Sequence, residues 1–141
     1  MQWYHIHPAV VHFPIALLSA GVLFQLLAWK RNRPDWDKIG VYCLGCGAVA
    51  ALGALGTGLL AEELAPHIPE AWRVLGWHER AGYGVVSLSS GLFLWRWKEG
   101  FFVPHPKWLY GLLTLLLLGF VSLSGFLGGR LVFEFGMGVK F

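Results

Sequence analysis

The chain consists mainly of long apolar runs separated by short polar segments. Residues 8–29, 39–61 and 108–129 contain no Asp, Glu, Lys or Arg. An α-helix crosses the hydrocarbon core of a bilayer with about 20 apolar residues, and its own hydrogen bonds satisfy its backbone there. Each of these three runs is therefore predicted to be a transmembrane helix.

A fourth helix is predicted over residues 77–97, although only residues 81–95 of it are free of charge. His78, Glu79 and Arg80 would lie at one membrane interface, and Arg96 would extend its guanidinium towards the other. The sequence thus predicts an all-α fold, a four-helix transmembrane bundle formed by residues 1–141 as a single domain.

Composition supports membrane insertion over a soluble fold. Hydrophobic residues make up 56% of the chain and charged residues 13%, whereas soluble proteins average about 25% charged residues. A soluble domain of this size has too small an interior to bury so much apolar surface. The formal net charge of +3 does not indicate nucleic-acid binding, because the basic residues lie in short segments between the apolar runs.

The distribution of Lys and Arg predicts the orientation. Residues 30–38 and 96–107 together carry seven Lys and Arg, and the segments on the opposite side carry Arg73, Arg80, Arg130 and Lys140. Because cytoplasmic loops are enriched in basic residues, we expect an up-down-up-down bundle with both termini outside. Leu131, Phe133 and Phe135 alternate with other residues, which predicts a short extended C-terminal tail.

Histidines are concentrated on the predicted outer side, where His5, His7, His12, His67 and His78 all fall. His12 and His78 stand near the outer starts of the first and third helices, which lie diagonally in such a bundle. One turn deeper, Ala16 and Gly82 are small enough to leave room for a flat macrocycle. Neutral imidazole is a common ligand of haem iron, so we expect His12 and His78 to be the axial ligands of a haem b.

Other residues could complete this site. His7 and His67 are expected to be alternative ligands, partners of the ligands, or the ligands of a second haem. Arg80 and Arg130, with Trp77 nearby, could pair with outward-pointing propionates. The same 17-residue spacing separates His12 from Trp29 and His78 from Trp95, which suggests that the first and third helices play equivalent parts. Interface anchoring and ordinary helix packing are the alternative roles for these residues.

Two stretches resemble a family of bacterial membrane proteins. They are residues 7–17, HPAVVHFPIAL, and residues 128–139, GGRLVFEFGMGV. Together they are similar to the motifs of domain of unknown function 2231, and the resemblance spans nearly the whole chain. It implies a four-helix membrane protein in which His7 and His12 match the N-terminal histidines. The family's pattern has Tyr and His where this chain has Phe133 and Phe135, so a second site that used that histidine is in doubt here.

These features favour a b-type cytochrome-like electron-transfer protein over a stand-alone enzyme. Its partners would be the lipid bilayer, a quinone, an outer cytochrome and further copies or subunits of a membrane complex. One alternative is a cofactor-free accessory or scaffold subunit of a respiratory complex, whose Gly-rich and Trp-rich faces would pack against other helices. A second alternative is a metal-ion-binding membrane protein that uses the same histidines.

Overall fold

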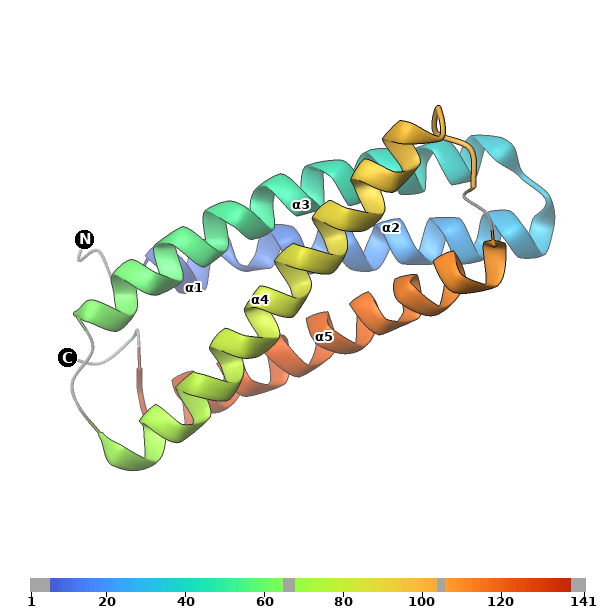
Figure 1. The fold of residues 1–141 in the computed structure, drawn as a ribbon. Coiled ribbons are helices and arrows are strands. Elements are labelled where there is room, and N and C mark those ends of the chain that lie inside the picture. The colour runs from blue at the N-terminus through green and yellow to red at the C-terminus, as the bar shows by residue number, and fades with distance from the viewer. Residues whose placement is uncertain (1–5, 65–67, 104–105, 138–141) are drawn as a thin grey trace.

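The computed structural model describes residues 6–64, 68–103 and 106–137, and their secondary structure is entirely helical. A short helix, α1 (Ile6–Val10), precedes four long ones: α2 (His12–Arg31), α3 (Pro34–Glu63), α4 (Pro69–Lys98) and α5 (Lys107–Phe133) (Figure 1). The all-α prediction is confirmed for these residues.

The boundaries of the long helices follow from local sequence. Asn32, which adopts the left-handed conformation with φ of 49°, ends α2, and asparagine tolerates that conformation better than most residues. Proline stands at the start of α3 and of α4, where the missing N–H group costs no helical hydrogen bond. Asp35 and Asp37 in the first turn of α3 complement the helix dipole.

The four long helices form two hairpins, and the links of both hairpins lie at the same end of the molecule (Figure 1). Only Asn32 and Arg33 join α2 to α3, so these helices pack side by side in opposite directions. α4 and α5 form the second hairpin, and α3 packs against α4 to join the two. The contact between α2 and α5 is much less extensive. The start of α1 and the end of α5 lie at the same end of the molecule, and the links within the hairpins lie at the other (Figure 1).

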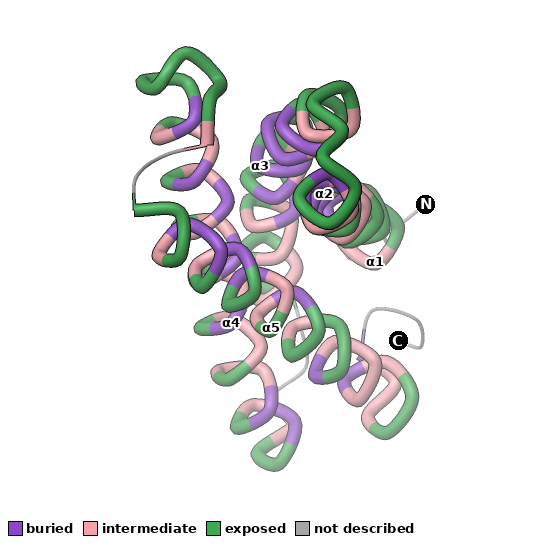
Figure 2. Tube along the Cα trace, turned by 90° about the vertical axis from the view of Figure 1, so that its right-hand side faces the viewer, coloured by how far each residue is buried: buried purple, intermediate pink, exposed green. Residues whose placement is uncertain are grey.

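The two hairpins bury corresponding positions, which reveals an internal repeat. Four of the six buried residues of α2 have a buried counterpart in α4 at numbers 71 higher, and five of the eight of α3 have one in α5 at numbers 70 higher. The pairs are Pro14 and Val85, Leu18 and Ser89, Gly21 and Leu92, Gln25 and Arg96, Gly40 and Tyr110, Val41 and Gly111, Leu44 and Thr114, Gly47 and Leu117, and Ala51 and Val121. These positions line the inward face of each helix (Figure 2).

A buried polar cluster joins all four long helices near the hairpin links. The Arg96 guanidinium is fully buried and forms an ion pair with Asp37, at 2.6 Å between Nη2 and Oδ2. The same nitrogen donates to the Phe101 carbonyl oxygen at 2.6 Å. The Tyr110 ring lies beneath the guanidinium at 5.5 Å, and its hydroxyl donates to Gln25 Oε1 at 2.9 Å. Pairing these groups compensates for removing them from water.

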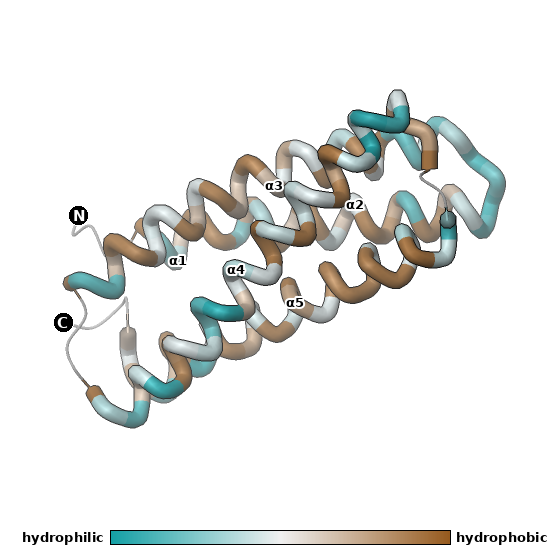
Figure 3. Tube along the Cα trace, viewed as in Figure 1, coloured by the Kyte–Doolittle hydropathy of each residue, from teal (hydrophilic) through white to brown (hydrophobic). Residues whose placement is uncertain are grey.

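Three helical segments are long and apolar enough to cross a membrane: Ile6–Arg31, Pro34–Glu63 and Lys107–Phe133. Among the described residues, α4 does not meet this criterion, because charged residues stand in its first half and also in its last turn, at Arg96 and Lys98, so that no stretch of sufficient length is apolar enough. The hydrophilic residues gather at the two ends of the bundle and at the start of α4 (Figure 3). The apolar spans were thus predicted correctly, and a fourth span remains a prediction.

Two expectations about local structure were wrong. α4 begins at Pro69, eight residues before the predicted start at 77, where a proline suits the first turn of a helix. α5 continues to Phe133, so Leu131 and Phe133 are helical and not part of an extended tail. Gly136, with φ of 68°, ends this turn by donating its N–H to Val132 O at 3.1 Å, as a left-handed C-cap does. Residues 138–141 of the predicted tail lie outside the described residues.

Candidate ligand cavity between two histidines

The N-terminal helical segment is interrupted just where it carries its histidines. Pro14 has no N–H to donate to Val10, so one helical hydrogen bond is missing at this point. α1 ends at Val10 and α2 begins at His12, while Val11 N–H still donates to His7 O at 3.1 Å. α1 packs against α3, and this contact places His7 on that helix.

His7 is held by the backbone of α3. Its Nδ1–H donates to Ala54 O at 3.0 Å, and Thr57 Oγ1 lies 3.3 Å from the same nitrogen. Because the Thr57 hydroxyl itself donates to Ala54 O at 3.0 Å, its oxygen is an acceptor for the imidazole. A carbonyl acceptor requires the proton on Nδ1, so Nε2 of the neutral ring carries the lone pair.

His78 is held in the same way by α5. Its Nδ1–H donates to Ser124 O at 3.0 Å. Each ring also lies over the glycine one turn beyond its acceptor: a Cβ on Gly58 would be 3.0 Å from His7 Cε1, and one on Gly128 would be 3.1 Å from His78 Cε1. The acceptors and the glycines are both related by the 70-residue repeat. The two imidazoles are therefore equivalent features of the two hairpins.

The two imidazole rings meet across the bundle. Their centroids are 6.1 Å apart and their planes are inclined at 81°. Two imidazoles on opposite sides of one metal ion, with bonds of about 2.0–2.1 Å and about 1.1 Å from nitrogen to ring centre, would have centroids about 6.2 Å apart. The observed centroid separation of 6.1 Å is close to this value.

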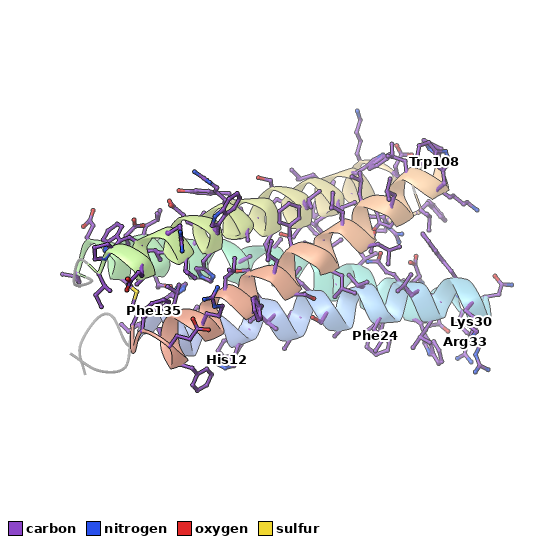
Figure 4. All side chains as sticks on the ribbon, turned by 90° about the horizontal axis from the view of Figure 1, so that it is seen from below. His12, Phe24, Lys30, Arg33, Trp108 and Phe135 are labelled. Carbon is purple, nitrogen blue, oxygen red and sulfur yellow. The ribbon has the colours of Figure 1, made fainter. Side chains whose placement is uncertain are left out.

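A cavity of about 430 Å³ surrounds this pair, within the usual range for small-molecule sites. Its walls are mostly apolar and come from both hairpins. Ala71, Val74, Leu127, Leu131 and Met137 form a separate apolar cluster at this end of the molecule, between the start of α4 and the end of α5. His12 and Phe135 lie at this end, opposite Lys30 and Arg33 (Figure 4).

The histidine that meets His78 is thus His7, and His12 has a different position. His12 is exposed, although it borders the cavity. His12 follows His7 by five residues, which in a helix is one full turn plus roughly 140°. The two side chains therefore project from different sides of the segment, and only His7 is directed inward. Ala16, the predicted small neighbour of His12, is exposed, whereas Gly82 lines the cavity as expected.

The predicted propionate partners lie outside the cavity wall. Arg130 donates to Glu134 from Nε at 2.8 Å and from Nη2 at 2.7 Å, and these hydrogen bonds lower the pKa of Glu134 below its usual value. The Arg80 guanidinium stacks on the exposed Trp77 ring at 4.9 Å. None of these residues is among those described as lining the cavity. His67 lies outside the described residues.

Sequence analysis missed the residues that hold the imidazoles: Ala54, Thr57, Gly58, Ser124 and Gly128. Every residue has a backbone carbonyl, so the sequence does not show which carbonyls accept these hydrogen bonds. The glycines could have indicated the pairing of the histidines, because Gly58 and Gly128 are separated by nearly the same number of residues as His7 and His78. A repeat of 70–71 residues therefore identifies the pair, whereas the His12–His78 spacing of 66 does not.

The residues present favour some metal sites over others. Within residues 6–64, 68–103 and 106–137, no three His, Cys, Asp or Glu side chains gather into a group that could hold a metal ion. Zinc sites in proteins use at least three protein ligands. Two imidazoles are enough only when the metal brings its remaining ligands with it, as a metallated macrocycle does.

Comparison with known proteins places the chain in a family but assigns it no activity. No curated protein and no solved structure matches it. A family model described as "Predicted membrane protein (DUF2231)" matches residues 4–141, which confirms the resemblance seen in the sequence motifs. The chain therefore belongs to the DUF2231 family of predicted membrane proteins.

Proposed function

We propose that this membrane protein binds one haem b between His7 and His78 and transfers electrons through it. The observation that carries the proposal is the separation of 6.1 Å between the two ring centroids, which suits two axial ligands on one iron. A cavity of about 430 Å³ around the pair, with mostly apolar walls, suits a flat macrocycle.

The hydrogen bonds of the two rings support ligation. Histidine ligands of metals usually donate their second N–H to a carboxylate or backbone carbonyl, which fixes the ring and raises its basicity. His7 and His78 both donate from Nδ1 to a carbonyl oxygen. A pair of imidazoles that served only for packing would not need this common orientation.

Haem also agrees with the small number of ligating side chains. The porphyrin supplies four nitrogen ligands, so the protein needs to supply only two. Two imidazoles with no open position suit electron transfer better than catalysis on a bound substrate, because the iron has no site left for a substrate. This distinction is the reason for proposing an electron carrier over an enzyme.

The proposed topology is a multi-pass bundle in the bacterial inner membrane, with α4 as the fourth span and both termini outside. Lys30, Arg31 and Arg33 lie at the end away from the cavity, as expected for the cytoplasmic side. The haem would then lie near the outer face, where an outer cytochrome could accept electrons delivered by a quinone in the membrane. Contacts with other copies or subunits belong to the same proposal.

The test is the absorption spectrum of the protein purified from haem-replete cells. Wild type should show the reducible bands of a low-spin haem, at one haem per chain. His7→Ala and His78→Ala should each lose the low-spin spectrum, because each removes one of the two axial nitrogens. His12→Ala is the matched control, since its histidine borders the same cavity, and it should keep low-spin ligation.

Two results would contradict the proposal. A colourless wild-type protein that also fails to bind added haemin would leave the cavity without its proposed ligand. Loss of the low-spin spectrum in His12→Ala, with His7→Ala unaffected, would return the ligand role to His12.

A further inference from the structure

The cavity has different walls on its two sides, although the hairpins are related by a repeat. On α3, Leu55 and Leu59 line the cavity, and the corresponding residues of α5, at numbers 70 higher, are Gly125 and Gly129. A Cβ at either glycine would have no neighbouring atom within 4 Å. The α5 wall therefore has unfilled space where the α3 wall has leucine side chains.

The α5 wall with this open space lies beside α2, which contacts α5 only sparsely. α2 and α5 touch each other far less than α3 and α4, the equivalent pair under the repeat. Exposed residues line the cavity on α2, α5 and α3: Ile15 is 38% exposed, Phe133 is 90% exposed and Leu59 is 40% exposed. The cavity-lining residues of α4 are all buried or half-buried. Of the exposed sides, the α2–α5 side is the one where glycines leave unfilled space.

The charged and polar groups of the lining also differ between the two sides. Glu62 of α3 and Glu79 of α4 both line the cavity, and Glu79 accepts a hydrogen bond from the Tyr83 hydroxyl at 2.9 Å. A carboxylate of a ligand would be repelled on that side. His12 lies on the α2 side, exposed and bordering the cavity, where an imidazole can donate a hydrogen bond to a carboxylate.

We propose that the macrocycle enters edge-first between α2 and α5, that Gly125 and Gly129 make room for its edge, and that His12 binds its carboxylates. This inference rests on the proposed function, and it assigns His12 to ligand positioning. A ligand with an apolar body and two acidic groups fits a cavity with one acidic and one glycine-lined side.

The first test fills the gap without disturbing the protein. Gly125→Leu and Gly129→Leu should each weaken haemin binding by about tenfold or more, since side chains that overfill a packed site cost about 1–3 kcal/mol. Gly119→Leu is the matched control on α5, because Gly119 also has open space around it but does not line the cavity. Binding is followed by absorbance on detergent-solubilised apoprotein, with circular dichroism to verify the fold.

The second test addresses His12. Wild type should bind haemin more tightly than haemin dimethyl ester, which lacks the carboxylates. His12→Leu, which has no hydrogen-bond donor, should reduce that preference about tenfold or more, the value of a hydrogen bond to a charged group, while the low-spin spectrum persists.

The outcomes separate the two proposals. If wild type binds neither compound, the proposed function fails and this inference fails with it. If wild type binds haemin through His7 and His78, but the Gly125→Leu and Gly129→Leu variants bind it as Gly119→Leu does, only the access route is wrong. An unchanged preference for the free acid in His12→Leu would remove the role assigned to His12.

Discussion

At the scale of single residues, the site depends on glycines as much as on histidines. Gly58 and Gly128 give their imidazoles access to the carbonyl oxygens of Ala54 and Ser124, because a Cβ would come within 3.0–3.1 Å of each ring. A larger side chain would displace the ring and break the Nδ1 hydrogen bond. Ring orientation is therefore fixed by the opposing helix.

This dependence leads to a prediction for haem ligation. Gly58→Leu and Gly128→Leu should convert the low-spin spectrum to a high-spin one, because the displaced imidazole no longer reaches the iron. Gly56→Leu in α3 is the control for the first, since no atom lies within 4 Å of a Cβ there. Absorption spectra of the haemin-loaded proteins decide the matter, and a low-spin Gly58→Leu protein would show that the glycine does not position His7.

The residue scale is also where sequence reasoning reached its limit. His78 is one of the two imidazoles that meet in the structure, and charged residues beside it, Glu79 and Arg80, mark the end of its apolar segment in the sequence. His7 and His12 could not be separated in this way, since the segment around them is apolar on all sides and gives no sign of which side faces inward. Only the contact of α1 with α3 distinguishes them.

At the scale of elements, a buried polar cluster joins the two hairpins at one end of the molecule, and the cavity separates them at the other. Every long helix contributes one side chain to this cluster, which consists of Arg96, Asp37, Tyr110 and Gln25. Apolar length predicted the spans, but it did not predict this cluster. Arg96 was expected to extend towards the interface, whereas it is fully buried against Asp37 of another helix.

Removing the charge that balances Arg96 should destabilise the bundle. Asp37→Asn leaves a buried guanidinium without its counter-ion, which should cost about 3 kcal/mol. Asp35→Asn, at an exposed position in the same first turn of α3, should cost less than about 1 kcal/mol. Thermal unfolding in detergent compares the two variants. Equal midpoints would mean that the ion pair contributes little to joining the hairpins.

At the scale of the whole molecule, two similar hairpins create one site at the place where they meet. The repeat places a histidine, a carbonyl acceptor and a glycine in each half, and the packing of the halves brings the two imidazoles together. Each hairpin supplies one of the two rings. This arrangement explains why the sequence predicted an outer-end histidine site from composition, while the pairing emerged only from the packing of the halves.

The central claim is that His7 and His78 ligate one iron, and electron paramagnetic resonance of the ferric, haemin-loaded protein tests it most directly. Two axial imidazoles should give a single low-spin signal without a high-spin component, and His7→Ala and His78→Ala should each convert it to high-spin. A high-spin signal in wild type, or a low-spin signal that survives both substitutions, would contradict the account.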